Sequence, residues 1–277
     1  MGKQLILLKL GGSLITDKTK PYTTNLQVIK RLVREIREAR EEKDISLVVG
    51  HGGGSFPHVS AKKYQTHKGI INKDSYKGIA KVQNDASKLN RIIVDELINA
   101  GENAMSIQIS ACSIAENGKI KEMFIEPIKL LLNYNMIPVP YGDVGLDLKR
   151  GCCILSTEEV LDYIAKTLHG TEFKPDKIVV CGIVDGIFTA DPLKNPEAKL
   201  IPEITTKNVG EVGNYLAGSS GIDVTGGMVH KVEKLLEIAK LGIESQIING
   251  LVEGNLKKAL KGEKVKGTVI RASTNDE

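Results

Sequence analysis

Three glycine-rich turns in the sequence each lie close to a lysine or a histidine. They are KLGGS at residues 9–13, HGGGS at residues 51–55, and the pair at 226–227, which precedes Lys231. Glycine lets backbone N–H groups approach an anion closely, because it has no Cβ and adopts positive φ angles without a clash. A helix that begins after such a turn adds a field that favours phosphate. One such turn predicts little, but three together predict a site that holds several phosphate groups.

The lysines beside these turns could supply the charge that phosphoryl transfer needs. That reaction depends on alignment and on positive charge around the moving group. Lys9 interrupts the apolar run LILLKLGGS, where a buried strand should exclude an unpaired charge. Asp143 follows another expected strand, and it is a candidate partner that would hold the lysines and keep them protonated. Lys18 lies in the loop after the first turn, and Lys231 lies on the helix after the third.

His58 closes the segment VVGHGGGSFPH and has two interpretations. It could be a polar loop residue at the start of a helix, or it could donate a hydrogen bond to a phosphate oxygen. His51, at the exit of a strand, is expected to be structural. Two other phosphate-binding patterns are absent, because the sequence has no G-x-x-x-x-G-K-[ST], and a G-x-G-x-x-G beginning at Gly52 would need glycine where Pro57 stands.

Short apolar runs alternate with segments of helical periodicity. Strands are expected at residues 4–10, 45–50, 104–109, 136–141, 177–184, 244–249 and 267–272. Helices are expected at about 28–39, 76–99, 126–134, 157–170, 226–242 and 254–262, and Thr157 is expected to cap the fourth of these. Two hairpins are expected at 115–124 and 147–155. This alternation predicts an α/β fold with a mostly parallel sheet, and no linker divides residues 1–277 into separate domains.

The composition is typical of a globular protein and excludes several classes of function. The chain has 277 residues, of which 41% are hydrophobic and 26% charged, with a net charge of +4. Tryptophan is absent and aromatic residues make up 4%, which argues against a surface that stacks nucleic-acid bases. The four cysteines form no C-x-x-C pair, so we expect reduced thiols and no zinc site. Without a signal peptide or a membrane-spanning run, the protein is expected in the cytoplasm.

These motifs, in this order, resemble the amino acid kinase superfamily. The matching segments are KLGGS at 9–13, GHGGGSF at 50–56, YGDV at 141–144, VDGIFTADP at 184–192 and DVTGGMVHK at 223–231. The resemblance extends from about residue 5 to residue 271. Within the superfamily, HGGGSFPH with its terminal histidine is similar to the isopentenyl phosphate kinase branch. The resemblance implies a three-layer αβα sandwich, with an acceptor lobe at about 1–170 and a nucleotide lobe at about 171–277.

The resemblance also implies a reaction in which ATP phosphorylates isopentenyl phosphate to isopentenyl diphosphate, a step of isoprenoid synthesis by a mevalonate pathway. Catalytic roles would fall to Lys9, Lys18, His58, Asp143 and Lys231. ATP would be bound by Lys9, Gly11, Gly12, Ser13, Gly54, Asp185, Phe188, Asp191, Pro192, Lys194, Gly227 and Lys231. The acceptor would be bound by Gly53, His58, Thr157, Ile79, Val82, Ala86 and Ile107, with Ile109 as a further candidate for its tail. Mg²⁺ would be held through ATP oxygens rather than by protein side chains, and the protein would be a homodimer.

Three positions depart from the pattern of this branch, and two alternatives stay open. Pro57 and Thr157 stand where members usually carry glycine, and Ile183 stands where they usually carry aspartate. The first alternative is a kinase of the same fold for another small phosphate or phosphonate, similar to fosfomycin kinase. The second is a nucleotide-binding regulatory module without catalysis.

Overall fold

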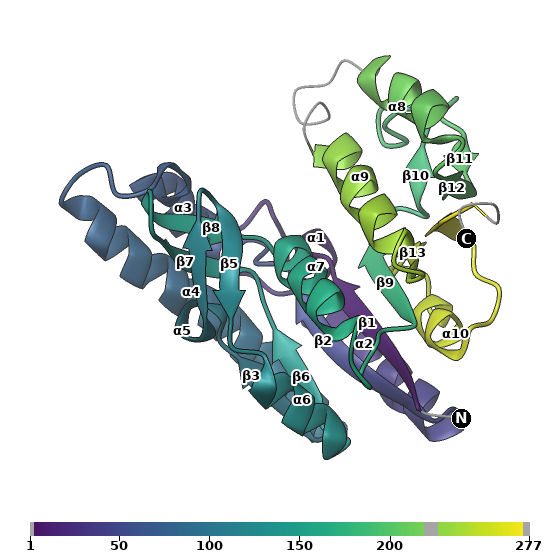
Figure 1. Ribbon diagram of the computed structural model, residues 1–277, viewed down its shortest axis with the longest axis horizontal. Coiled ribbons are helices and arrows are strands. Elements are labelled where there is room, and N and C mark those ends of the chain that lie inside the picture. The colour runs from purple at the N-terminus through teal and green to yellow at the C-terminus, as the bar shows by residue number, and fades with distance from the viewer. Residues whose placement is uncertain (1–2, 219–226, 274–277) are drawn as a thin grey trace.

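A six-stranded sheet lies at the centre of the molecule, with the strand order β12-β14-β13-β9-β1-β2 (Figure 1). The computed structural model describes residues 3–218 and 227–273, without the side chains of 214–218 and 227–231. The strands of this sheet are β1 (Gln4–Leu10), β2 (Ile45–His51), β9 (Lys177–Gly182), β12 (Glu203–Thr205), β13 (Glu244–Asn249) and β14 (Gly267–Arg271). Of the pairings in this sheet, that of β13 with β14 is antiparallel and the others are parallel. The predicted mostly parallel sheet is therefore confirmed.

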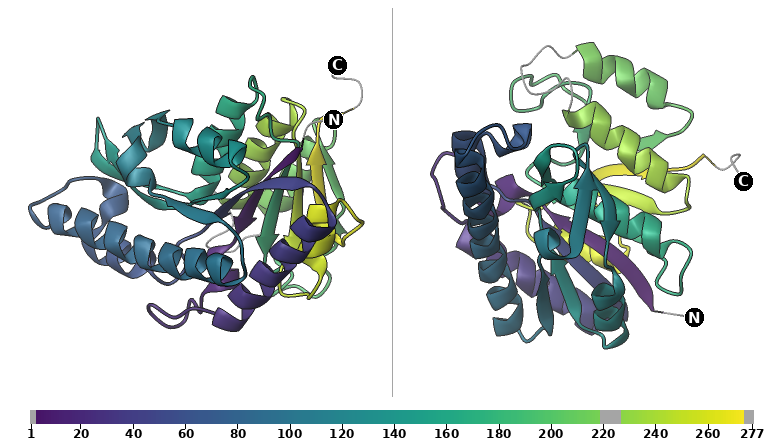
Figure 2. Two further views of the ribbon diagram at one scale, coloured as in Figure 1. Left: turned by 90° about the horizontal axis from the view of Figure 1, so that it is seen from below. Right: turned by 60° about the vertical axis from the view of Figure 1, so that its left-hand side comes forward.

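Helices cover both faces of this sheet, which gives the three expected layers (Figure 2). Successive side chains of β1 point to opposite faces, so Leu8 joins one hydrophobic core and Leu7 joins the other. The first core is completed by α2 (Leu26–Glu42), α4 (Asp74–Asn99) and α10 (Asn255–Lys261). The second is completed by α6 (Glu126–Asn133), α7 (Thr157–Leu168) and α9 (Gly227–Ala239). The fold class is thus confirmed as an αβα sandwich.

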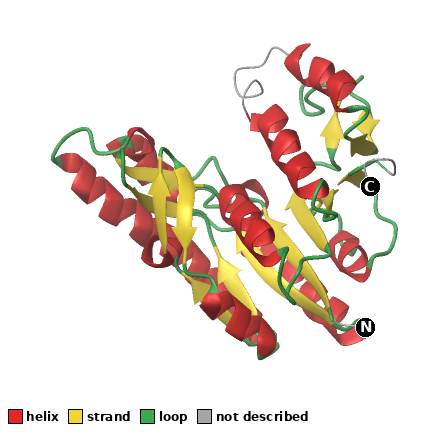
Figure 3. Ribbon diagram, viewed as in Figure 1, coloured by secondary structure: helices red, strands yellow, loops and turns green. Residues whose placement is uncertain are grey.

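Smaller elements surround this framework (Figure 3). β3 (Ala104–Ile107) pairs with β6 (Ile137–Pro140), which continues the sheet beyond β2 through a bridge between His51 and Tyr141. The two predicted hairpins are present and join in one four-stranded sheet, made of β5 (Lys119–Met123), β4 (Ser113–Glu116), β7 (Asp143–Asp147) and β8 (Gly151–Leu155). The remaining elements are α1 (Gly12–Ile15), α3 (Pro57–Tyr64), the 3-10 turn η1 (Thr66–Lys68), α5 (Ile109–Cys112), β10 (Ile187–Phe188), β11 (Leu200–Ile201) and α8 (Val209–Gly218).

Two local predictions were wrong. The strand expected at 104–109 ends at Ile107, because the chain turns into the short helix α5 at Ile109. The cap of α7 is Ser156 rather than Thr157, since the Ser156 hydroxyl accepts the amide hydrogen of Glu159. Thr157 is the first helical residue, and its hydroxyl points elsewhere.

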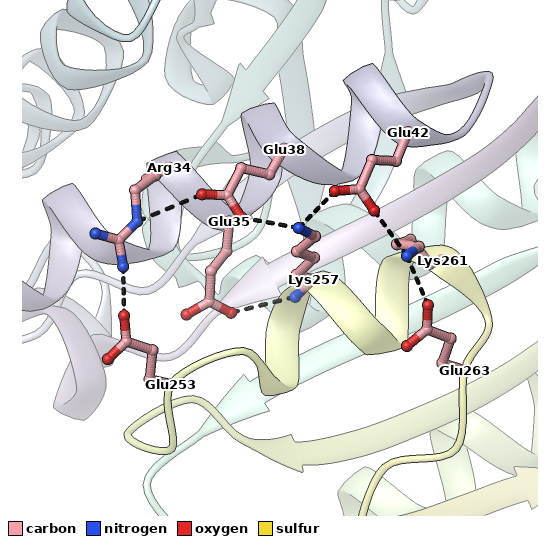
Figure 4. A network of polar contacts seen from close by, with 8 residues as sticks. All are labelled: Arg34, Glu35, Glu38, Glu42, Glu253, Lys257, Lys261 and Glu263. Carbon is pink, nitrogen blue, oxygen red and sulfur yellow. Dashed lines mark hydrogen bonds and ion pairs between the residues drawn. The ribbon is translucent and has the colours of Figure 1, made fainter.

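A network of ion pairs joins the last helix, α10, to α2 (Figure 4). Lys257 lies 3.0 Å from Glu38 and 2.6 Å from Glu42, while Lys261 lies 2.7 Å from Glu42. The hydrogen bonds from these two lysines lower the pKa of Glu42 to about 2. Beneath this network, the buried Glu35 accepts the amide hydrogen of Lys257. The C-terminal part of the chain is therefore fixed to the layer that supports β1 and β2.

All four cysteines are free, as the sequence predicts. No helix within the described residues combines the length and the hydropathy that crossing a bilayer requires.

Candidate active site

The first two glycine turns lie against each other where β1 and β2 end. A Cβ atom on Gly12 would lie 2.6 Å from the amide nitrogen of Gly54, and one on Gly52 would lie 2.9 Å from the amide nitrogen of Gly12. Gly54 has a φ of +53°, and a Cβ there would meet the Thr16 hydroxyl at 2.1 Å. Any larger residue would push the turns apart. The glycines therefore bring two strand ends into backbone contact.

Thr16 joins the two turns through its hydroxyl group, and two amides of the second turn have no acceptor among the described residues. Its hydroxyl donates to the carbonyl of Gly12 at 2.7 Å and accepts from the amide of Ser55 at 3.0 Å. Within the part of the chain that the structure describes, the amides of Gly53 and Gly54 donate to no protein acceptor. Both residues line the main pocket. These two N–H groups can therefore bind an anion that enters it.

Lys9 brings a nearly buried ammonium group to this place. It lies next to the end of β1, is 9% exposed, and forms an ion pair of 2.5 Å with Glu158 in the first turn of α7. The pairing balances a charge that would otherwise be costly inside the fold. Lys9 and Glu158 both line the pocket. Glu158 therefore positions the Lys9 ammonium group.

Asp143 does not make the ion pair with Lys9 that the sequence led us to expect. Its carboxylate accepts the backbone amides of Ser110 at 3.1 Å and Val144 at 2.8 Å. Burial raises the pKa of Asp143, although these hydrogen bonds oppose the shift. Asp143 does line the pocket. Glu158, rather than Asp143, pairs with Lys9, because the start of α7 faces the end of β1.

Lys18 and His58 lie at the same pocket from two further segments. Lys18 is exposed in the loop after α1, and His58 is exposed on the first turn of α3. Partial burial by the surrounding protein lowers the pKa of His58, and the nearby charge of Lys18 lowers it further. The lowered pKa favours the neutral imidazole, which can donate one N–H. Together these side chains offer a cation and a hydrogen-bond donor to one anion.

These groups surround a cavity of about 450 Å³. At the end formed by α3 and α4 its lining is apolar and includes Ala61, Val82 and Ile154. Towards β9 and α9 it is again largely apolar, with Val180, Ile238 and Ile247. Between the two ends lie the glycine turns and the lysines. The cavity can therefore hold two molecules with apolar parts whose phosphate groups meet in the middle.

The comparisons with known proteins agree with this geometry. Residues 4–249 match the family model described as "Amino acid kinase family". The chain belongs to the amino acid kinase family.

Two relatives that match over nearly their whole length are isopentenyl phosphate kinases. The chain is 37% identical to the isopentenyl phosphate kinase of Methanothermobacter thermautotrophicus, over 96% of this chain and 98% of the relative. It is 36% identical to that of Methanocaldococcus jannaschii with the same coverage. A solved structure described as "X-ray structures of isopentenyl phosphate kinase" matches with a TM-score of 0.81 and 34% identity, over 96% of this chain and all of that one. The resemblance predicted from the motifs is confirmed.

The pocket of this member of the family gathers many of the predicted site residues. The residues that line it are Lys9, Gly11, Gly12, Ser13, Lys18, Gly53, Gly54, His58, Val82, Asp143 and Thr157. They come from segments up to 148 positions apart in the chain, between Lys9 and Thr157. Their assembly in one cavity is what the sequence predicted.

Other predicted site residues lie outside this lining. They are Ile79, Ala86, Ile107, Ile109, Asp185, Phe188, Asp191, Pro192 and Lys194. Ile79 packs beside Val82 in a small cluster, whereas Ile107 and Ile109 belong to the second core. Asp185 pairs with Lys266 at 2.6 Å, although its neighbours Val184 and Gly186 do line the cavity. Gly226 and the side chain of Lys231 lie outside the described residues, while Gly227 begins α9.

The three departures from the branch pattern have local explanations. Thr157 is 1% exposed, and its hydroxyl donates to the carbonyl of His51 at 2.5 Å, so it ties α7 to the end of β2. Pro57 is the first residue of α3, where a backbone N–H has no partner within the helix. Ile183 lines the pocket as a partly buried residue at the edge of the first core. None of these residues blocks the glycine turns.

Sequence reasoning missed four residues that build the site: Thr16, Ser156, Glu158 and Lys234. Lys234 lines the pocket from α9 and pairs with Glu159 of α7. Glu158 could have been suspected, since it lies three residues after the end of β8. Carboxylates are common in the first turn of a helix for electrostatic reasons, however, so its sequence position is ambiguous.

The donors in this pocket suit anions rather than bare metal ions. Within residues 3–218 and 227–273, no group of three or more His, Cys, Asp or Glu side chains is placed to hold a metal. The donors that line the pocket are the glycine amides, lysine ammonium groups and the His58 imidazole, and the carboxylate of Glu158 there is paired with Lys9. A divalent cation would fit here together with a nucleotide, with phosphate oxygens as its main ligands.

His51 lies buried at the end of β2, next to the glycine turn, and makes the free energy of unfolding depend on pH. It is 1% exposed, receives a hydrogen bond from Asn90 on Nε2 at 3.1 Å, and stacks on Tyr141. Burial lowers its pKa to about 4 from the ordinary 6.5. As the pH falls, His51 is therefore protonated in the unfolded chain before it is protonated in the folded protein. The stability that neutral His51 contributes is lost as the pH falls from 6.5 towards 4.

We expect this residue to account for about 3 kcal/mol of the unfolding free energy lost between pH 7 and pH 4. Urea titrations at pH 7, 6, 5 and 4 would measure it. The His51→Gln variant should lose correspondingly less over the same range, while His67→Gln, at an exposed position, should follow the wild type. Equal pH slopes in His51→Gln and wild type would show that the buried imidazole is not responsible.

Proposed function

We propose that this protein transfers the γ-phosphoryl group of ATP to isopentenyl phosphate, giving ADP and isopentenyl diphosphate. The observation that carries the proposal is the meeting of Lys9, Lys18 and His58 with two free glycine amides in one cavity. That arrangement has donors for two phosphate groups side by side. Relatives of this length that carry the isopentenyl phosphate kinase name support the choice of acceptor.

The chemistry requires little from the protein beyond position and charge. A phosphate monoester has its second pKa near 6, so at pH 7 most acceptor molecules already carry a nucleophilic oxygen. The acceptor oxygen attacks the γ-phosphorus. The bond between the γ-phosphorus and the β,γ-bridging oxygen breaks, and ADP leaves with the bridging oxygen. His58 donates its N–H to the acceptor phosphate without becoming a nucleophile. Lys9, Lys18 and the glycine amides stabilise the charge of the transferring group and the leaving phosphate.

The apolar lining at the α3 and α4 end suits the isopentenyl tail. Val82 of α4, Ala61 of α3 and Ile154 of β8 come from three elements and meet there. The opposite apolar end, near Ile238 and Ile247, suits the nucleoside. We accordingly assign the acceptor to the part of the fold before about residue 170 and the nucleotide to the part after it. Asp185, Phe188, Asp191, Pro192, Lys194, Gly227 and Lys231 are proposed to contact ATP once it is bound.

The remaining expectations follow from this assignment. Mg²⁺ is proposed to enter with ATP on phosphate oxygens and to shield their charge. We also propose that the protein acts in the cytoplasm as a homodimer, as the family resemblance implies.

Initial rates with ATP and a panel of acceptors test the proposal. The panel is isopentenyl phosphate, methyl phosphate, glycerol 3-phosphate and the phosphonate fosfomycin. Burying four more carbons than methyl phosphate at about 0.8 kcal/mol each predicts kcat/KM about 10²-fold higher for isopentenyl phosphate. Equal turnover of all the monoesters would refute the acceptor, and preference for fosfomycin would favour the phosphonate alternative. Absence of turnover with every acceptor, despite ATP binding, would favour a regulatory module.

A further inference from the structure

The loop that carries Lys18 is held by an unusual residue, Tyr22. Tyr22 has a φ of +53°, a left-handed conformation that is rare for a bulky residue. Such strain persists only where surrounding contacts impose it, and it is concentrated at functional sites. Tyr22 lies four residues after Lys18, in the returning half of the loop formed by residues 17–24.

Contacts from three directions impose this conformation. The amide of Tyr22 donates to the carbonyl of Ser55 at 3.3 Å, and its ring meets Phe56 edge to face at 5.8 Å. Its hydroxyl donates to the carboxylate of Asp85 at 3.0 Å. Ser55 and Phe56 belong to the glycine turn that leads to His58, and Asp85 lies on α4. Tyr22 thus joins the Lys18 loop to both elements of the acceptor end.

Burying the carboxylate of Asp85 costs free energy unless hydrogen-bond donors compensate it. It is fully buried in α4, three residues after the pocket-lining Val82. Its other polar neighbours are less close, with Lys81 and Asn84 at 3.4 Å and Lys88 at 3.9 Å. The Tyr22 hydroxyl is therefore the best-placed donor to this carboxylate among the described residues. A buried carboxylate without a good donor would be unfavourable.

The base of the loop is fixed independently. Thr16 and Thr24 form an isolated antiparallel bridge, and the amide of Asp17 donates to the carbonyl of Thr23 at 3.0 Å. Within the described residues Lys18 makes no ion pair of its own. The direction of its exposed side chain therefore depends on the path of the loop, which the bridge holds at the base and Tyr22 holds in the returning half.

We propose that Tyr22 and Asp85 form a positioning clamp that holds the 17–24 loop so that Lys18 faces His58 across the acceptor end of the pocket. The inference rests on the proposed function, because it assigns the clamp to the phosphoryl-transfer step. Neither residue is among those that line the pocket, so both act through Lys18. Their loss should lower kcat and leave KM for ATP unchanged.

The decisive experiment is a double-mutant cycle of Tyr22→Phe with Lys18→Ala, read as kcat with ATP and isopentenyl phosphate. Tyr22→Phe keeps the ring against Phe56 and removes the hydroxyl alone. We expect it to lower kcat about tenfold, since a shift of about 1 Å in a charged group is costly in catalysis. In the Lys18→Ala background the same change should have no further effect, because the group it positions is gone.

Asp85→Asn is the second variant and Tyr134→Phe is the matched control. Asparagine keeps an oxygen that accepts the Tyr22 hydroxyl hydrogen, so kcat should fall less than in Tyr22→Phe. Tyr134 is 65% exposed on the surface after α6, and its change to Phe should leave kcat unaltered. A kcat within twofold of wild type in Tyr22→Phe, or an undiminished loss in the Lys18→Ala background, would overturn the proposal.

Amide hydrogen exchange separates failure of the clamp from failure of the proposed function. Exchange of residues 17–24 should be faster in Tyr22→Phe than in wild type, whichever acceptor the enzyme uses. If wild type does not turn over isopentenyl phosphate, the proposed function fails, and the exchange result still decides the clamp. Unchanged exchange in this loop would overturn the clamp even in an active kinase.

Discussion

Replacing Lys18 by alanine should lower kcat with isopentenyl phosphate by about 10³-fold and change KM for ATP by less than about threefold. The reason lies in the position of this lysine. It is exposed at the pocket, and within the described part of the chain it has no carboxylate partner to share its charge. Its ammonium group is therefore available to the phosphoryl group as charge moves between the two substrates. Steady-state rates over a matrix of ATP and acceptor concentrations would measure both constants.

Lys20 provides the control for this substitution. It lies two residues further along the same loop, its side chain is 72% exposed, and its nearest carboxylate is Asp17 at 3.9 Å. Because it does not line the pocket, Lys20→Ala should keep kcat within about twofold of wild type. If Lys18→Ala raised KM for ATP and left kcat unchanged, Lys18 would bind the nucleotide equally in the ground state and the transition state and would not speed the chemical step.

The change of Glu158 to glutamine should lower kcat by about 10²-fold and also weaken the fold. Lys9 is 9% exposed, and removing the charge of Glu158 leaves its ammonium group without the carboxylate that lies 2.5 Å away. Breaking a buried pair in this way is costly, and partial exposure of Glu158 reduces the expected loss to about 1–3 kcal/mol of unfolding free energy. Turnover measurements and urea denaturation of the same preparation would give both values.

Two further variants sharpen this prediction. Asp143→Asn removes the carboxylate that the sequence suggested, yet that group accepts backbone amides rather than the Lys9 ammonium. Its effect on kcat should therefore be the smaller of the two. Glu122→Gln, on the exposed side of β5, controls for the loss of one negative charge. A larger loss of kcat in Asp143→Asn than in Glu158→Gln would restore Asp143 as the residue that positions the lysine.

The framework of the fold could be predicted because its signals are local. The strand bounds at residues 4–10 and 244–249 agree with the structure, since apolar runs of this length between polar turns have few alternatives. The predicted helix cap is off by one residue because Ser156 and Thr157 are both residue types that cap helices. What decides between them is tertiary structure, because the carbonyl of His51 accepts the Thr157 hydroxyl hydrogen across 106 positions of the chain.

The site was predictable where a residue type is costly unless it has a function. A lysine inside an apolar strand and three successive glycines both met that condition, and Lys9 and the 52–54 turn do line the pocket. Glu158 and Tyr22 gave no such signal. A glutamate at a helix start and a tyrosine in a loop are ordinary, and their importance follows from contacts with Lys9 and Asp85 that only the folded chain provides.

The central claim is that one cavity holds ATP and a phosphate monoester with their phosphate groups adjacent. The most direct test is a crystal structure with isopentenyl phosphate and a non-hydrolysable ATP analogue bound. We predict the γ-phosphate between Lys18 and the glycine turns, and the acceptor phosphate within about 3 Å of His58 with its tail towards Val82. A nucleotide bound elsewhere, or an acceptor phosphate out of contact with His58, would contradict the account.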